Sequence, residues 1–321
     1  MSPRRTIGVD MGGTKLLAGA VDSELSVHHR TQRQLAGLDQ SELVDVAVDA
    51  VEEACGQADG EVVGVGFGIP CLIDTATGLA RMSVHLPLAD IQFGDVLGER
   101  LGLPVFVDND ANAAALAEHL AGAAAGSSEA VVLTIGTGIG GGLILHGELY
   151  RGATGAGGEL GHTVIDLDGP RCNGDCPNHG CVEALASGTA LAREARRVAA
   201  EEPDCALARA AADGYELAGP LVTELAHDGD AAARGVLELI GTRLGVAIAN
   251  FINIFNPQVV VIGGGVMAAG ELLLEPARAE VAARALGPAR QGVRIVPAAF
   301  GVEAGMIGAA ALAFRGLGDG P

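Results

Sequence analysis

Three polar residues stand where a strand-like segment gives way to a helical one, and their side chains could act on a hydroxyl group. Asp108, Asn109 and Asp110 follow the apolar residues 105–107 and precede an alanine-rich stretch. Ligands of open α/β sheets usually lie at such junctions. A carboxylate at position 110 could accept the proton of a hydroxyl that attacks a phosphoryl group, while Asn109 binds a hydroxyl. An aspartate there could also cap the following helix, and the two roles are compatible.

Glycine-rich turns follow three of the strand-like runs, and such turns can bind phosphate. Glycine lets the backbone approach a ligand closely, so that successive N–H groups converge on phosphate oxygens. The hydroxyls of Thr14 and Thr137 could add donors. A tight hairpin also needs glycine for steric reasons. Each turn taken alone therefore fits a purely structural role as well as a phosphate-binding role. The turns are Gly12-Gly13-Thr14, residues 136–142 including Gly138, and Gly263-Gly264-Gly265.

Two charged residues flank the first glycine turn. Asp10 precedes it at the end of a strand-like run, where a carboxylate suits Mg²⁺ bound to phosphate. Lys15 follows it and could neutralise phosphate charge. It is the only lysine in the chain. The alternative is that Lys15 is an ordinary exposed surface residue, which is the commoner role of lysine.

The second turn also satisfies the dinucleotide motif G-x-G-x-x-G between Gly136 and Gly141. That motif must open a helix to place a pyrophosphate at the helix N-terminus. The residues that follow, Leu143-Ile144-Leu145, indicate a strand instead, and a Walker A pattern is absent. The sequence therefore argues against a dinucleotide-dependent dehydrogenase.

Three of the six cysteines fall within ten residues, at positions 172, 176 and 181. In a chain expected to stay in the cytosol, this clustering indicates a metal before a disulfide. Three thiolates and one imidazole make a closed tetrahedral zinc site. His162 and His179 compete for the fourth position. Glu159 and Glu183 add carboxylates on either side of this segment.

A repeated pattern of strand, glycine turn and strand must position these residues. Residues 6–20 match residues 132–146 when Asp10 is laid over Gly136 and Gly12 over Gly138. This predicts an internally duplicated domain, with chance similarity between two glycine-rich hairpins as the alternative. Strands alternate with helices along the whole chain, which predicts an α/β fold. Further strands are expected at 62–69, 105–107, 259–262 and 293–296, and helices at 40–55, 111–124, 185–200, 231–254 and 305–314; residues 204–229 suggest no function.

Composition limits the partners of the chain. The 321 residues carry a net charge of −20, and no basic face that would bind nucleic acid is apparent. Hydrophobic residues make up 49%, yet no apolar run reaches the roughly 18 residues that span a membrane. The N-terminus has no pattern of a signal peptide. We therefore expect a cytoplasmic protein with small-molecule ligands.

Taken together, these motifs resemble those of the ROK family of sugar kinases, especially its bacterial glucokinases. The resemblance spans nearly the whole chain. It rests on Asp10-Met-Gly-Gly-Thr-Lys15, Val107-Asp-Asn-Asp-Ala-Asn112, the stretch 135–162 ending in Gly-Glu-Leu-Gly-His, the cysteine cluster followed by Val182-Glu183, and Gly263-Gly-Gly265.

The resemblance implies an actin-like ATPase (ribonuclease H-like) fold, which has two related α/β lobes and a cleft between them. We expect a small N-terminal lobe over residues 1–117 and a large lobe with a zinc loop over 118–303. A helix over about 304–321 is expected to pack back on the small lobe. The family is usually dimeric or tetrameric.

The resemblance also implies roles for particular residues. Asp110 would be the catalytic base for the 6-hydroxyl of a hexose, glucose being the best single expectation. Asn109, Glu159, His162 and Glu183 would hold other hydroxyls, with Gly68 lining the pocket. Zinc would bind His162, Cys172, Cys176 and Cys181. ATP phosphates would meet Gly12, Gly13, Thr14, Thr137 and Gly138, beside Asp10 with Mg²⁺ and Lys15, and the nucleoside would lie near Gly263, Gly264 and Gly265.

Two residues and one spacing depart from the family pattern. His85-Leu86-Pro87 stands where Asn-Leu is usual, Cys71 replaces a glycine after Pro70, and the cysteine spacing is longer by two residues. His85 keeps N-acetylmannosamine, N-acetylglucosamine, mannose or fructose open as substrates, and polyphosphate remains open as donor. A sugar-responsive transcription regulator would need a helix-turn-helix module, for which we expect no room before about Thr6. A non-catalytic, zinc-stabilised sugar sensor is disfavoured by Asp110 and Lys15.

Overall fold

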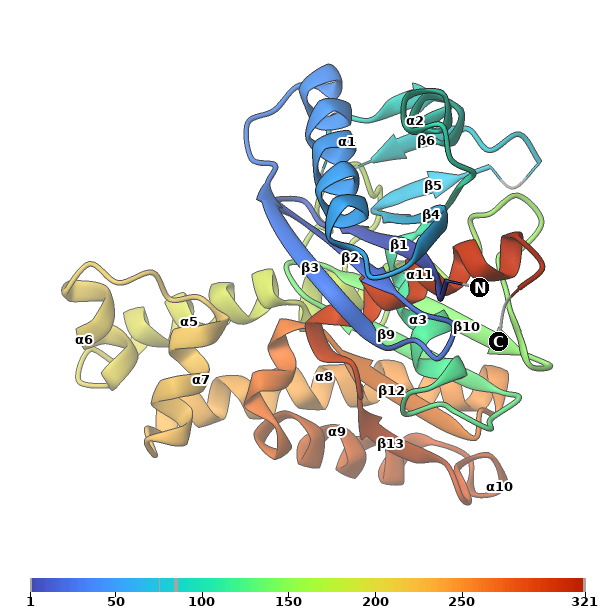
Figure 1. Cartoon of the computed structure of the whole chain (residues 1–321). Helices are drawn as coiled ribbons and strands as arrows, with labels where there is room; N and C mark the ends of the chain where they lie inside the picture. The colour runs from blue at the N-terminus through green and yellow to red at the C-terminus, as the bar shows by residue number, and fades with distance from the viewer. Residues whose placement is uncertain (1, 75, 84–85, 320–321) are drawn as a thin grey trace. The chain divides into compact units, whose positions relative to one another are not determined.

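The computed structural model describes residues 2–74, 76–83 and 86–319, and the chain forms two compact units (Figure 1). Unit 1 comprises residues 1–128, 141–158 and 298–321, and unit 2 comprises residues 129–140 and 159–297. The C-terminal segment thus belongs to the same unit as the N-terminus. The expected lobe boundary between residues 117 and 118 stays a prediction.

A five-stranded sheet of order β3-β2-β1-β4-β8 forms the centre of unit 1. The first three strands are antiparallel neighbours, whereas β1, β4 and β8 run parallel. Parallel strands end at the same edge of a sheet, which here carries the polar residues of interest. The strands are β1 (Arg4–Met11), β2 (Lys15–Val21), β3 (Val27–Gln34), β4 (Glu61–Ile69) and β8 (Val105–Asn109).

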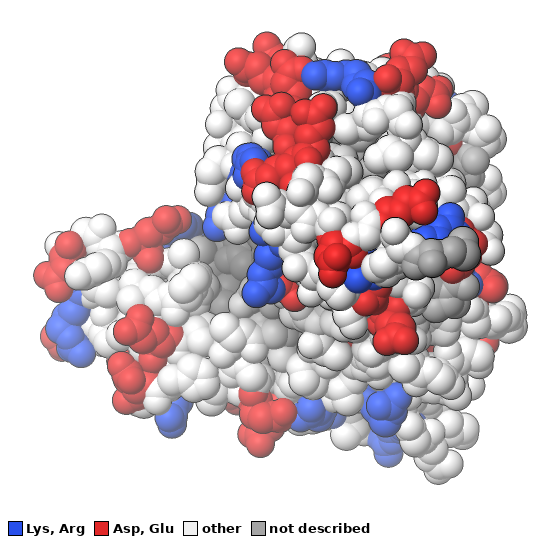
Figure 2. Space-filling model, in the orientation of Figure 1, with Lys and Arg blue, Asp and Glu red and all other residues white. Residues whose placement is uncertain are grey.

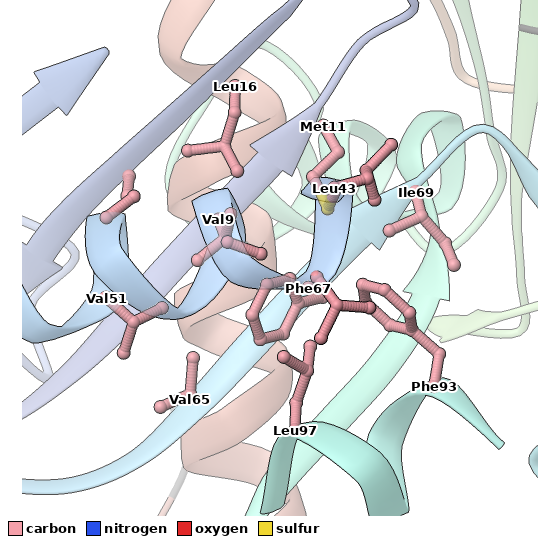
Figure 3. Packing of buried hydrophobic residues seen from close by; sticks show 14 of the residues in the cluster. Val9, Met11, Leu16, Leu43, Val51, Val65, Phe67, Ile69, Phe93 and Leu97 are labelled. Carbon is pink, nitrogen blue, oxygen red and sulfur yellow. The ribbon is translucent and has the colours of Figure 1, made fainter. Parts of the chain in front are cut away.

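Helices cover both faces of this sheet. On one face lie α1 (Gln40–Gln57) and α2 (Phe93–Leu101), and on the other lie α3 (Asp110–Leu120) and α11 (Ala304–Gly316) (Figure 1). Figure 3 shows Phe67 of β4 between residues of α1 and α2, with its ring 5.5 Å from that of Phe93. Helix α11 approaches the other face so closely that a Cβ at Gly66 would collide with the carbonyl group of Ala309.

Helix α1 shows how the sequence pattern produces this packing. Its apolar residues recur with helical spacing and are buried, and Asp39 and Glu42 form a capping box at its start. Its outer face is acidic, as Figure 2 shows near the top of the view, and carries the exposed residues Asp45, Asp49, Glu52 and Glu53. A small sheet of order β5-β6-β7 follows β4 and comprises Cys71–Ile73, Ala80–Ser83 and Ala89–Ile91.

The second five-stranded sheet has the order β11-β10-β9-β12-β13. In each sheet, strands numbered by their order within that sheet are arranged 3-2-1-4-5, and the last three run parallel. The predicted duplication is therefore seen as a shared strand order. The strands are β9 (Ala130–Ile135), β10 (Ile139–Leu145), β11 (Glu148–Leu149), β12 (Val259–Gly263) and β13 (Arg294–Pro297).

The described helices of unit 2 all lie in its second segment, residues 159–297. They are η1 (Leu160–His162), α4 (Val182–Ala186), α5 (Gly188–Glu201), α6 (Ala206–Ala212), α7 (Gly219–His227), α8 (Ala231–Phe255), η2 (Gly265–Ala269), α9 (Glu271–Arg284) and α10 (Gly287–Arg290). The short η3 (Gly301–Glu303) precedes α11 in unit 1.

Two expected helices differ from those observed, and the segment that suggested no function is partly helical. The helix expected over 185–200 is two helices, because Ser187 leaves helical geometry and accepts a hydrogen bond from the N–H of Ala190. The helix expected to reach residue 124 ends at Leu120, and the carboxylate of Glu118 accepts a hydrogen bond from the N–H of Ala123 just beyond that end. Residues 204–229 contain α6 and α7.

Among the described helices, α8 is long and apolar enough to cross a membrane by length and composition, which we did not expect. Of its apolar window, 61% is buried inside the structure. Buried residues such as Leu237, Ile240 and Leu244 show the reason, since a core helix of this length is apolar for packing.

Candidate active site

Three parallel strands of unit 1 end side by side at the predicted base. In the sheet register Asp10 of β1 pairs with Gly68 of β4, and Gly68 pairs with Asp108 of β8. Asp110 follows as the first residue of α3, and a Cβ at Gly68 would lie 3.3 Å from its Cα. The structure thus brings Asp10, Gly68, Asn109 and Asp110 together at one sheet edge.

The junction of β8 with α3 fixes the direction of these side chains. Asn109 is the N-cap of α3, and its side-chain oxygen accepts the N–H groups of Ala111 at 2.9 Å and Asn112 at 3.2 Å. The capping role considered for the aspartate therefore belongs mainly to Asn109, although Asp110 Oδ1 also lies 2.8 Å from the Ala111 nitrogen. The amide nitrogen of Asn109 is the part that this cap does not use.

Asp10 has an unusual electrostatic environment. Burial raises its pKa to about 7, and the negative charge of Asp110 contributes to the same increase. Its carboxyl group lies against Gly305 in the first turn of α11, where a Cβ would collide with it. Two carboxyl groups held this close favour a cation between or beside them.

The first glycine turn is the hairpin between β1 and β2. Gly12 donates its N–H to the carbonyl oxygen of Lys15 at 2.8 Å, which closes the turn immediately after the strand that carries Asp10. Gly13, Thr14 and Lys15 are exposed. The backbone and side-chain donors of this turn therefore stand at the surface of unit 1.

In unit 2 the third glycine turn lies against the end of the strand that leads into the second turn. Gly264 has a positive φ of 89°, and a Cβ there would collide with the backbone of Ile135 at the end of β9. The register places Gly263 opposite Thr134. Gly264 is therefore required both by its backbone conformation and by close approach to the strand that leads into Thr137 and Gly138.

Glu183 lies beneath the turn that contains Gly138. Its Oε2 atom accepts the N–H of Ile139 at 2.9 Å, and a Cβ at Gly138 would collide with the same carboxylate. The residue is 8% exposed. β10 begins at Ile139, within the G-x-G-x-x-G motif, so the motif leads into a strand and does not open the helix that a dinucleotide fold requires.

The start of α5 also reaches this turn, a contact that we did not predict from the sequence. Gly188 donates its N–H to the carbonyl oxygen of Gly136 at 2.8 Å, and the hydroxyl of Thr189 donates to that of Thr137 at 2.8 Å. Ser187-Gly188-Thr189 has the composition of a helix start, which was the available signal. The continuous apolar spacing over 185–200 concealed it.

Four potential metal ligands form a compact cluster in unit 2. The ligand atoms of His162, Cys172, Cys176 and Cys181 all lie within 4.8 Å of one another, and His179 is not among them. The sulfurs of Cys176 and Cys181 are 3.9 Å apart, and Cys172 Sγ is 3.5 Å from His162 Nδ1. Burial raises the pKa of Cys172 and of Cys181, and neighbouring thiols add to the increase for Cys172.

The cluster is continuous with the predicted sugar residues of unit 2. His162 Nε2, on the opposite side of the ring from Nδ1, is 4.0 Å from Glu159 Oε2, and Cys172 Sγ is 3.8 Å from Glu183 Oε1. The predicted site residues therefore form two groups. Unit 1 holds Asp10, Gly12, Gly13, Thr14, Lys15, Gly68, Asn109 and Asp110, and unit 2 holds Thr137, Gly138, Glu159, His162, Cys172, Cys176, Cys181, Glu183, Gly263, Gly264 and Gly265.

The structure describes only one of the two residues that depart from the family pattern. Cys71 is buried in β5, where it is 3% exposed. His85 lies outside the described residues.

Similarity to known proteins identifies the family of this chain. The sequence profile of the ROK family matches residues 6–315. The chain belongs to the ROK family. Glucokinase of Thermotoga maritima is 35% identical to this ROK protein over 320 residues, which cover 99% of this chain and 100% of that one.

Solved structures of ROK proteins have a similar fold. A ROK family glucokinase from Streptomyces griseus, determined in complex with glucose and AMPPNP, has a TM-score of 0.88 at 34% identity and covers 97% of this chain and 99% of its own. A ROK hexokinase from Thermus thermophilus has a TM-score of 0.78 at 34% identity, covering 98% and 100%. The expected α/β fold of the actin-like ATPase type is thereby confirmed.

Proposed function

We propose that this ROK protein is a glucokinase that transfers the γ-phosphoryl group of ATP to the 6-hydroxyl of glucose. The observation that carries the proposal is the full-length similarity to glucokinases in a chain that keeps Asp110 beside Asp10 at the ends of parallel strands. Fold similarity alone would not indicate a reaction, since one fold serves many functions.

Asp110 is the base in this proposal. As the bond between the sugar oxygen and the γ-phosphorus forms, the bond to the bridging oxygen of ADP breaks, and the hydroxyl proton passes to the Asp110 carboxylate. The products are glucose 6-phosphate and ADP. The first turn of α3 holds this carboxylate in a fixed backbone position, because Asn109 caps the helix.

ATP and its Mg²⁺ would be bound by the residues that the family resemblance implies. Asp10 would hold Mg²⁺, because a carboxyl group with a pKa of about 7 gains most from a nearby cation. The hairpin of Gly12, Gly13 and Thr14 would offer N–H groups to phosphate oxygens, with Lys15 adding charge. Thr137 and Gly138 would do the same, and the turn from Gly263 to Gly265 would lie near the nucleoside.

Glucose would be held through its hydroxyl groups. Asn109 offers its amide nitrogen, and Glu159, His162 and Glu183 offer carboxylates and an imidazole, while Gly68 leaves space beside Asp110. A site of this kind rejects sugars that lack a hydroxyl, because its own polar groups would lose their partners.

Zinc would bind the cluster of three cysteines and His162. With Zn–S near 2.3 Å and Zn–N near 2.0–2.1 Å, a tetrahedral site separates two sulfurs by about 3.8 Å and a sulfur from a nitrogen by about 3.6 Å. The observed 3.9 Å and 3.5 Å fit these separations. Nδ1 of His162 would bind the metal, and Nε2 would remain for the sugar.

A coupled assay of ADP release over a panel of hexoses tests the function. The panel includes glucose, mannose, fructose, N-acetylglucosamine and N-acetylmannosamine, with ATP or polyphosphate as donor. We expect ATP and glucose to give the highest kcat/KM. A higher kcat/KM with an N-acetylated sugar would overturn glucose as the substrate.

Asp110→Asn tests the base. We expect kcat to fall by about 10²–10⁴, because the proton acceptor is lost, while calorimetry still detects glucose binding. Asp95→Asn is the matched control, since Asp95 is an exposed residue of α2 in the same unit. Turnover of Asp110→Asn equal to that of the control would remove the assigned base.

A further inference from the structure

Asp108 is a buried carboxylate beside the proposed base that the reaction itself does not use. It is 5% exposed. Its Oδ1 atom accepts the backbone N–H of Asn109 at 2.8 Å and the side-chain amide of Asn112 at 3.0 Å. It therefore binds both ends of the short segment that carries Asn109 and Asp110.

The other oxygen of Asp108 holds a residue that is distant in sequence. Oδ2 accepts a hydrogen bond from Nε of Arg151 at 2.7 Å, and Nη2 of the same guanidinium group lies 2.7 Å from Oδ2 in an ion pair. The carboxylate of this ion pair is largely shielded from water, since the Asp108 side chain is 7% exposed. The Arg151 side chain is 34% exposed. A charge-assisted contact with little solvent is stronger than an exposed surface pair.

Arg151 in turn closes a tight loop. Its carbonyl oxygen accepts the N–H of Gly157 at 2.9 Å, and a Cβ at Gly157 would lie 2.7 Å from the nitrogen of Gly152. The loop over 151–158 belongs to unit 1 and leads directly into Glu159. One guanidinium group thus connects the base-bearing junction with the loop that precedes a proposed sugar ligand.

We propose that Asp108 and Arg151 form a positioning pair for the sugar. The pair holds the backbone from Asn109 to Asn112 and the loop over 151–158 in one arrangement within unit 1. The part concerning the sugar rests on the proposed glucokinase function. Neither side chain takes part in proton or phosphoryl transfer; their effect is to fix the backbone that carries the groups that do.

Kinetics of Arg151→Ala, Arg151→Lys and Asp108→Asn test the proposal. We expect Arg151→Ala to raise KM for glucose by on the order of tenfold or more, with KM for ATP changed by less than about twofold. Arg151→Lys keeps the charge without the two-pronged contact and should lie between parent and Arg151→Ala. Added guanidinium ion should partly restore the KM of Arg151→Ala.

Arg315→Ala is the matched control, because Arg315 pairs with Glu148 at 3.5 Å on the surface of the same unit. It should leave both KM values unchanged. Arg151→Ala with a lower melting temperature but an unchanged KM for glucose would overturn the sugar-positioning role. Asp108→Asn, which keeps the oxygen that accepts from Asn109, provides the same test if Arg151→Ala does not fold.

Hydrogen exchange without sugar separates this proposal from the proposed function. In Arg151→Ala the amides of residues 109–112 and 151–158 should exchange faster than in the parent and in Arg315→Ala. If the parent does not phosphorylate glucose, the glucokinase proposal fails, while faster exchange in both segments still supports the coupling. Unchanged exchange in either segment would show that the pair does not couple them.

Discussion

At the residue scale, the proximity of Asp10 to Asp110 governs the electrostatics of the candidate site. Asp10 stands near the end of β1, Asp110 is the first residue of α3 directly after β8 of the same sheet, and the negative charge of Asp110 opposes ionisation of Asp10. The proposed mechanism needs Asp110 ionised, so a cation bound at Asp10 would lower the repulsion between them.

Replacing Asp10 by Asn should change how stability depends on pH. A carboxyl group whose pKa rises from 3.8 to about 7 on folding binds a proton more tightly in the folded state, so stability falls as pH rises between these values. Asp10→Asn removes this loss, and its free energy of unfolding should exceed that of the parent by roughly 2–4 kcal/mol at pH 8 and by less at pH 5.

Urea unfolding at both pH values, without Mg²⁺, measures this difference. Asp95→Asn serves as the control and should show the same pH dependence as the parent. A difference between Asp10→Asn and the parent that is equal at pH 5 and pH 8 would contradict the raised pKa.

At the scale of elements, buried Glu118 joins the end of α3 to the segment that enters α11. Its Oε2 atom accepts the N–H groups of Ala123 at 2.8 Å and Ala299 at 3.0 Å, and Oε1 accepts that of Phe300 at 2.9 Å. The residue is 0% exposed. A helix that begins at the proposed base thus ends at an anchor for the C-terminal segment.

Glu118→Ala should therefore destabilise the protein. Three part-buried backbone N–H groups would lose their acceptor, so we expect the free energy of unfolding to fall by about 2–5 kcal/mol, measured by urea unfolding. Glu148→Ala is the control, since Glu148 is exposed in the same unit and should change stability by less than about 0.5 kcal/mol. A Glu118→Ala protein as stable as this control would show that the three contacts contribute nothing.

The loop between η1 and α4 provides the second element-scale prediction. We expect about one zinc per chain in the purified protein, and loss of that zinc and of thermal stability in Cys176→Ser, because thiolate ligands hold a loop with little core of its own. Elemental analysis and a melting curve measure both. Cys205→Ser is the control, since Cys205 caps α6 away from the cluster, where serine caps well. A parent free of zinc would contradict the metal site.

At the scale of the whole molecule, the net charge indicates which class of ligand the protein does not favour. The net charge of −20 argues against a nucleic-acid ligand, and acidic side chains are spread over the face seen in Figure 2. The cytoplasmic location stays a prediction.

The family resemblance predicts a dimer or tetramer. Light scattering should then give two or four times the chain mass of 32.1 kDa. Ile254 and Leu286, 68% and 66% exposed in unit 2, are apolar residues that an assembly would cover. A monomer at micromolar concentration would contradict the prediction.

Much of the fold and of the candidate site was predictable from local pattern. The hairpin of Gly12 to Lys15, the junction at Asp110 and the strand after Gly138 depend on residues adjacent in the chain, and each is seen in the structure. Backbone preferences and short-range hydrogen bonds suffice to determine such features.

Contacts between distant segments were not predictable in this way. His162 rather than His179 joins the three cysteines, and Arg151 reaches Asp108 across 43 positions. Glu118 binds residues 181 and 182 positions away.

By itself, then, the sequence determined the turns, the strand-to-helix junctions, the cysteine spacing and the family, because these follow from neighbouring residues. Only the tertiary structure decided that Asn109 caps α3 and which buried charges meet, and it placed His162, which the family resemblance had implied, beside the three cysteines. Those outcomes depend on how strands and helices pack, and packing brings together residues whose separation in sequence carries no periodic signal.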